Sequence, residues 1–166
     1  LPARQMGVAT GSLMIMLIAW ATIRWIGARS TRALFAVDPP LDLRRWYRGM
    51  ASIVRRQVDS VLLGEATYLC GMLRDLFGGT PDEVPDAYIR ASAVSAGEPL
   101  GGNLRHLKET PVRMYTEPDV DFWLAYGADL YSLNALDVVY AAAELLAMGN
   151  AEAELIVTRG PMDHLG

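Results

Sequence analysis

Short apolar runs alternate along the chain with longer segments of helical period. The runs are short enough for strands and are closed by breaks, so we predict strands at residues 5–9, 31–37, 111–116 and 153–158. The intervening segments with helical character are residues 12–26, 43–77 and 135–148. This alternation predicts the α/β class, with a parallel sheet covered by helices in a single domain over residues 1–166.

Local signals suggest where several elements begin and end. Asp38-Pro39-Pro40 should stop the second strand, because prolines cannot continue a central strand. Within residues 43–77, Gly64 is expected to separate two helices. Thr80-Pro81-Asp82-Glu83 indicates a helix start, and Pro85 either keeps that helix short or restarts it. Asn134 is expected to cap the helix that follows it. Residues 43–107 would then form a helical cap inserted between two strands.

Composition excludes several classes of function. The chain has 166 residues, 52% of them hydrophobic and 20% charged, which predicts a globular domain with a real core. With a net charge of −4 and no basic run with interleaved aromatics, it is not expected to bind nucleic acid. Cys70 is the single cysteine and the two histidines are far apart, so we expect no disulfide, metal site or cofactor.

The apolar stretch at residues 13–23 raises the question of a membrane span. A span needs about 20 apolar residues, and Arg24 interrupts this run. A signal peptide would need a basic start and a small-residue cleavage site, which the segment lacks. We therefore predict a buried helix and no membrane partner, while the cellular location stays unknown.

The stretch Gly7-Val8-Ala9-Thr10-Gly11 has the pattern of the nucleophile turn of serine hydrolases, with alanine in place of serine. Small flanking residues permit a sharp reversal from strand to helix, which presents the central side chain at the rim of the sheet. Ala9 keeps that backbone and removes the chemistry. The same glycines also suit close helix packing or a phosphate turn, and Thr10 or Ser12 would be the substitute hydroxyls.

Two further candidates follow later strands. Asp119 comes after the strand at 111–116, with Glu117 and Asp121 as competitors, and His164 comes after the last strand. In open parallel sheets, functional groups gather beyond the carboxyl ends of the strands. The simpler alternatives are that Asp119 caps a turn and that a histidine near a chain end is solvated.

Taken together, these motifs make the chain resemble the carboxyl-terminal portion of an α/β-hydrolase, of the serine esterase or prolyl-oligopeptidase-like kind. The residues that carry the resemblance are Gly7-Val8-Ala9-Thr10-Gly11, residues 35–42 (Phe-Ala-Val-Asp-Pro-Pro-Leu-Asp), Tyr115-Thr116-Glu117-Pro118-Asp119 and His164. The resemblance implies that Ala9 stands at the nucleophile position, that the Thr10 N–H is an oxyanion donor, and that Asp119 and His164 are the acid and base. It also implies that the first strands of the family's sheet are missing here.

The expected function is that of an acyl hydrolase for carboxylic-ester or peptide substrates, inactive as written because the nucleophile is replaced. The alternative is a non-catalytic binding or assembly module on the same scaffold, either a homo-oligomer or completed by a partner chain. Aromatic residues between 46 and 68, with Trp123 and Tyr126, would line an acyl pocket or pack the helical cap. His106 is expected on the surface, and Asp38 and Asp42 are expected in a turn and at a helix start, with a weaker substrate-side role.

Overall fold

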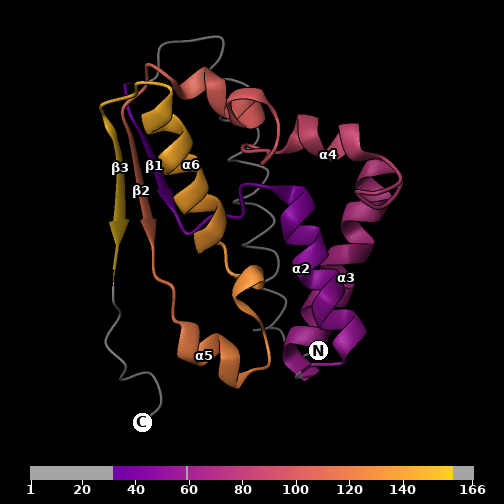
Figure 1. Ribbon diagram of the computed structural model, residues 1–166. Helices are drawn as coiled ribbons and strands as arrows, with labels where there is room; N and C mark the ends of the chain where they lie inside the picture. Colours follow the sequence, from indigo (N-terminus) through magenta and orange to yellow (C-terminus); the bar gives the residue numbers. More distant parts are fainter. Residues whose placement is uncertain (1–31, 59, 159–166) are drawn as a thin grey trace.

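The computed structural model describes residues 32–58 and 60–158, and these contain a three-stranded parallel sheet (Figure 1). The strands are β1 (Leu34–Val37), β2 (Val112–Thr116) and β3 (Ala153–Val157), in the order β1-β2-β3. Leu34 is in register with Val112, which is in register with Ala153. The α/β class and three of the predicted strands are thereby confirmed, while the predicted strand 5–9 and helix 12–26 lie outside the described residues.

Helices make up most of the rest of the described chain. Between β1 and β2 lie α2 (Leu43–Arg56), α3 (Ser60–Phe77), α4 (Pro85–Ala91) and the 3₁₀ segment η1 (Pro99–Leu107). Between β2 and β3 lie α5 (Val120–Ala125), the 3₁₀ turn η2 (Leu130–Ser132) and α6 (Ala135–Ala147). Within the described ranges, no helix is long and apolar enough to span a membrane.

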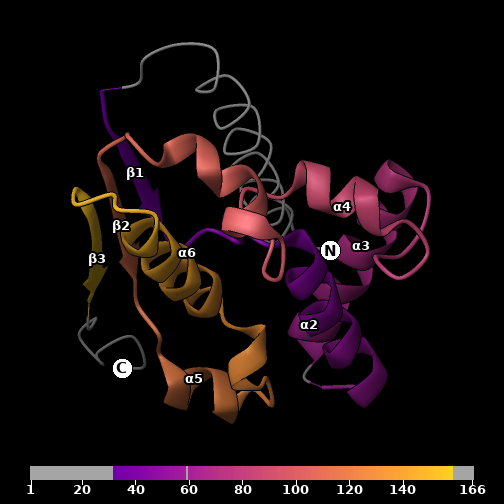
Figure 2. The same ribbon diagram turned by 45° about the horizontal axis from the view of Figure 1, so that its top comes forward.

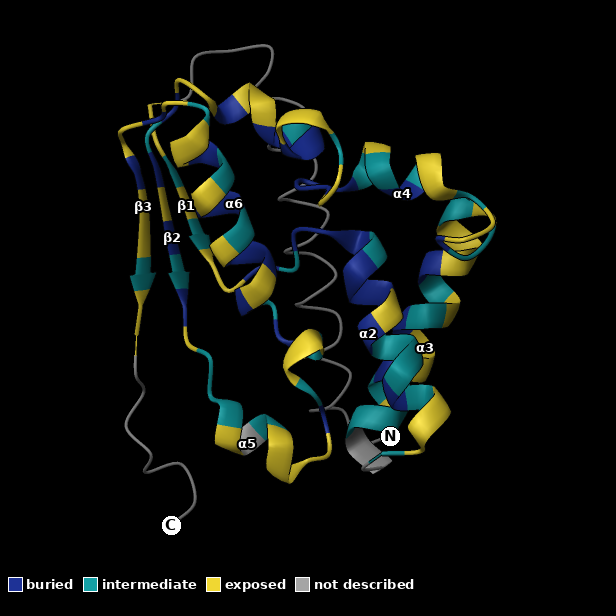
Figure 3. Ribbon diagram, in the orientation of Figure 1, coloured by how far each residue is buried: buried dark blue, intermediate teal, exposed yellow. Residues whose placement is uncertain are grey.

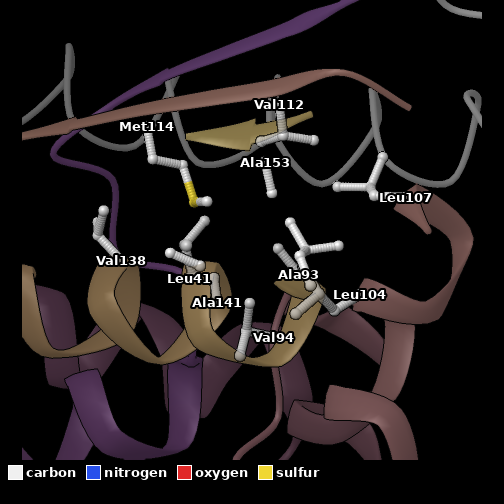
Figure 4. Close-up of a cluster of buried hydrophobic side chains, with 12 residues drawn as sticks. Leu41, Ala93, Val94, Leu104, Leu107, Val112, Met114, Val138, Ala141 and Ala153 are labelled. Carbon is white, nitrogen blue, oxygen red and sulfur yellow. The ribbon is translucent and has the colours of Figure 1, made fainter. Parts of the chain in front are cut away.

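One hydrophobic cluster joins the sheet to α6. Figure 4 shows side chains of β2 and β3 meeting those of α6 and of the segments before and within η1. Burial of this apolar surface fixes α6 on one face of the sheet. The cluster consists of Leu41, Ala93, Val94, Leu104, Leu107, Val112, Met114, Val138, Ala141, Ala142, Leu145 and Ala153.

A second cluster holds α2, α3 and α4 together, and we call these three helices the helical lobe. Its buried members are Leu43, Trp46, Tyr47, Leu69, Leu73 and Tyr88. Figures 1 and 2 both show the lobe grouped on the α6 side of the sheet. The segment predicted as a cap, residues 43–107, thus divides between two cores, because Leu104 and Leu107 of η1 belong to the sheet cluster.

The opposite face of the sheet is open among the described residues. Phe35 and Val37 of β1 are 63% and 72% exposed, and their register partners on β2 are Arg113 and Tyr115. Arg113 also pairs with Glu154 of β3 at 2.5 Å, so a charged pair lies beside the apolar side chains. In Figure 3, α6 has many buried positions, whereas most of β3, at the edge of the sheet, is exposed.

One local prediction about helix ends is wrong, and two others are met only in part. The break between α2 and α3 lies at Gln57, whose left-handed backbone (φ 52°) ends α2, whereas Gly64 lies inside α3. Residues 80–83 form a turn in which Glu83 accepts a hydrogen bond from the Thr80 N–H, and the helix begins only at Pro85. Asn134 precedes α6 without capping it through its side chain, which instead donates to the Asp38 carbonyl.

Candidate functional site

The carboxyl ends of β1 and β2 lie together at one edge of the sheet because the two strands are parallel neighbours. Asp38 directly follows β1, and Glu117 directly follows β2. Parallel α/β sheets bind ligands at this edge, so the two carboxylates lie where polar groups of a site are expected.

Asp38 is held in an unusual backbone conformation. Its φ of 42° is in the left-handed region, which is uncommon for residues other than glycine, although aspartate and asparagine tolerate it best. Three hydrogen bonds fix it there. The Asp38 N–H donates to the Tyr115 carbonyl at 2.8 Å, the Asn134 side chain donates to the Asp38 carbonyl at 3.0 Å, and the Thr116 hydroxyl donates to the Asp38 carboxylate at 2.8 Å.

A cavity of about 390 Å³ opens beside Asp38, between this edge of the sheet and the helical lobe. Its volume is in the range that holds a small molecule. Aromatic and aliphatic side chains from the lobe and from α5 form much of its wall: Trp46, Met50, Ile53, Leu62, Leu69 and Trp123. Of the aromatic residues expected to line a pocket or pack the cap, Trp46 and Trp123 line this cavity, and Trp46 and Tyr47 also belong to the buried cluster of the lobe. Tyr68 and Tyr126 are exposed and are not among the described residues that line the cavity.

Three carboxylates line this cavity: Asp38, Glu65 of α3 and Glu117. No Lys or Arg is among the lining residues in the described part of the chain, and none of the ion pairs found there involves these carboxylates. Desolvation by its neighbours raises the pKa of Asp38, the Thr116 hydrogen bond lowers it, and repulsion from Glu117 adds to the rise. Among the described residues, the walls of the site are therefore mostly apolar and its charged side chains are negative.

Asp119, the predicted triad acid, lies at the start of α5. Its N–H donates to the Glu117 carbonyl at 2.9 Å, and its carbonyl accepts from the Trp123 N–H at 3.2 Å. It is half-buried and is not among the described residues that line the cavity, although Glu117, two residues earlier, is. This geometry is compatible with the interpretation of Asp119 as a cap or turn residue after the strand and leaves its acid role a prediction.

The remaining predicted site residues, Ala9, Thr10 and His164, lie outside the described residues. Their meeting with Asp119 stays a prediction. His106 is exposed on η1, as expected, and Asp42 caps α2 by accepting from the N–H groups of Arg44 and Arg45. Over residues 32–58 and 60–158, no group of three His, Cys, Asp or Glu side chains is arranged to hold a metal ion.

Sequence reasoning gave Asp38 little weight and did not consider Glu65. The position of Asp38, directly after an apolar strand, was a usable signal of a group at the carboxyl edge. Glu65 had no such signal, because it reaches the cavity only through the packing of α3 against the rest of the domain.

Comparisons of the chain with protein-family models, with curated proteins and with solved structures found no match.

Proposed function

We propose that this chain is a serine-hydrolase-type domain whose cavity binds a small ester or peptide acyl ligand and whose nucleophile position is occupied by Ala9. The observation that carries the proposal is the apolar cavity at the carboxyl edge of the parallel sheet, between β1, β2 and the helices inserted between them. Enzymes with open parallel sheets place their reactive groups at this edge. The resemblance in residues 7–11, 35–42 and 115–119 supplies the reaction class.

In the proposed chemistry, a serine at position 9 attacks the acyl carbonyl while His164 takes its proton. Asp119 fixes the tautomer of that imidazole and stabilises its charged form. The Thr10 N–H supports the negative oxygen that develops in the transition state. With Ala9 the attacking oxygen is missing, so the chain as written binds the ligand and leaves the bond intact.

The test is to restore the nucleophile. The Ala9→Ser variant should hydrolyse p-nitrophenyl butyrate at least ~10³-fold faster than the parent chain, since losing a serine nucleophile costs up to ~10⁶-fold in rate. Ala9→Ser combined with His164→Ala is the matched control and should return to the parental rate. A folded Ala9→Ser variant without ester hydrolysis would contradict the proposal.

The same background distinguishes the candidate acids. Asp119→Asn added to Ala9→Ser should lower the rate by roughly 10⁴-fold if Asp119 orients the histidine. Asp121→Asn, two residues later, serves as the comparison and should retain most of the activity, whereas Glu117→Gln tests the other candidate acid, which also lines the cavity. A large loss confined to Glu117→Gln would move the acid role to that residue.

A second candidate function, assembly into a homodimer, has support from a different observation. Phe35 and Val37 are largely exposed on the open sheet face, where two copies of the chain would cover each other's apolar side chains. Light scattering on the purified chain should then give twice the monomer mass, and Phe35→Ser with Val37→Thr should return it to the monomer. A monomeric parent chain at micromolar concentration would dismiss this function.

A further inference from the structure

The charged side chains that the described residues contribute to the cavity are all negative. Asp38, Glu65 and Glu117 line it, and no cationic side chain of the described residues does. The nearby guanidinium of Arg45 is occupied, since it pairs with the buried carboxylate of Asp137. A ligand carrying a carboxylate or a phosphate would be repelled at this site, whereas a cation would be attracted.

From this cavity we infer the class of ligand: an organic ammonium compound whose charge lies near Asp38 and Glu117 and whose N-alkyl groups contact the tryptophan-lined wall. The inference rests on the proposed function and narrows it, since it assigns a positive charge to the ester or peptide that the cavity would hold. It does not depend on the replaced nucleophile, because binding precedes any reaction.

Asp38 and Glu117, the two carboxylates at the strand ends, suit a cation because one is oriented by a hydrogen bond and the two repel each other. The Asp38 residue as a whole reaches solvent, while neighbouring atoms desolvate its carboxylate enough to raise its pKa, and the hydrogen bond from Thr116 orients that carboxylate. Glu117 follows the next strand and repels Asp38, which contributes to the raised pKa of Asp38. A bound cation would relieve this repulsion, so the two carboxylates gain more from it than two isolated ones would.

The apolar wall adds a second contribution. Trp46 and Trp123 both line the cavity, one from the helical lobe and the other from α5. Tryptophan is the side chain that attracts organic cations most strongly through its ring face. Carboxylates together with tryptophans therefore favour an alkylated ammonium group over a small inorganic cation. The inorganic cation would keep its water shell and would gain little from contact with an aromatic wall.

The experiment compares two ligands of the same shape. Choline carries a trimethylammonium group, and 3,3-dimethylbutan-1-ol is its neutral isostere with carbon in place of nitrogen. In ligand-observed NMR titrations of the full chain, choline should bind at least about tenfold more tightly than the alcohol. Equal affinities, or no binding of choline, would overturn the inference.

Charge-neutralising variants assign the effect to the cavity. Asp38→Asn keeps a residue that tolerates the left-handed backbone and an oxygen that accepts from Thr116, and Glu117→Gln changes the charge alone. Each should weaken choline binding about threefold or more and leave the binding of the alcohol unchanged. Glu109→Gln, on an exposed residue outside the cavity, is the matched control and should change neither. If Asp38→Asn does not fold, Glu117→Gln alone decides the outcome.

The two proposals fail in different ways. An Ala9→Ser variant that hydrolyses neutral p-nitrophenyl esters while the chain does not prefer choline supports the proposed function and rejects the cationic ligand. A chain that prefers choline through Asp38 and Glu117, yet stays inactive as Ala9→Ser, supports the cation site and rejects the hydrolase chemistry.

Discussion

Arg45 of α2 and Asp137 of α6 form a buried, two-pronged ion pair that links the helical lobe to the sheet core. The Arg45 Nε and one terminal nitrogen donate to the two oxygens of the Asp137 carboxylate, and a further nitrogen reaches the Tyr131 carbonyl. Asp137 also accepts from the N–H groups of Leu41 and Asp42 at 2.9 and 3.0 Å. One carboxylate therefore fixes the turn that leaves β1, the start of α2 and its own helix.

Removing the Asp137 carboxylate should lower the free energy of unfolding substantially. Asp137→Ala leaves the Arg45 charge buried without its partner, so we expect a loss of about 3–5 kcal/mol in the free energy of unfolding, measured by urea denaturation. The double variant Arg45→Met with Asp137→Leu removes both charges and should be more stable than Asp137→Ala. Glu154→Gln, which breaks the exposed pair with Arg113, is the control and should cost about 1 kcal/mol or less. A small loss for Asp137→Ala would mean that water reaches the pair.

Gly64 should be a position where alanine stabilises the fold. It is an exposed residue inside α3, and an added Cβ would meet no atom within 4 Å. Alanine lowers the backbone entropy of the unfolded chain, so Gly64→Ala should raise the free energy of unfolding by about 0.5–1 kcal/mol. Gly78→Ala is the contrasting variant, because a φ of 82° strains any side chain there and should make it destabilising. Thermal unfolding of the two variants should move in opposite directions.

Asp38 should lower the stability of the native state as the pH rises through its raised pKa. Its pKa is raised above 3.8, first by desolvation, so the native state holds its proton over a range in which the unfolded chain has lost it. Ionisation of Asp38 therefore costs native stability as the pH rises through this range, and Asp38→Asn avoids the cost. The melting temperature of Asp38→Asn relative to the parent should increase from about pH 3.5 to about pH 7. The reverse trend would show that the ionised form is the better stabilised one in the native state.

Cys70 should react slowly with thiol reagents in the native protein. Burial raises the pKa of its thiol from 9.0 to about 11, although Arg74 lowers it in part. At pH ~8 the thiolate fraction would be about 100-fold below that of an unperturbed thiol, and the thiolate is the reactive form. Labelling with a chromogenic disulfide should therefore be at least ~100-fold faster in denaturing urea than in native buffer. Similar rates in the two conditions would indicate an accessible, ordinary thiol.

The strands were predictable because each one is a short apolar run closed by a strong local signal, such as Pro39-Pro40 after β1. The boundary between α2 and α3 could not be predicted. Gln57 ends α2 in a left-handed conformation that glutamine seldom adopts, and no residue pattern in the sequence indicates it. Gly64 misled the prediction because Ala66 and Leu69, buried in the same helix, outweigh the small entropic cost of one glycine.

The candidate site was predictable only in its location. The carboxyl edge of a parallel sheet follows from strand order, and aspartates after strands can be read from the sequence. The joint position of Asp38, Glu65 and Glu117 around one cavity is a tertiary property, since α3 brings Glu65 to two strand ends that are far away along the chain. Asp119 follows β2 and its carbonyl accepts a hydrogen bond from the Trp123 N–H of α5, while its role as the acid stays a prediction.

The helical lobe leaves the sheet after β1 and returns to it at β2, its immediate neighbour, and it has a hydrophobic cluster of its own. Residues can thus be gained or lost in the lobe without shifting the pairing of the strands. Substitutions in the lobe could thus reshape the wall of the cavity while the pairing of Val37 with Tyr115 stays as it is. Diversity among related proteins would then be concentrated in α2 and α3, and the strand ends would change least.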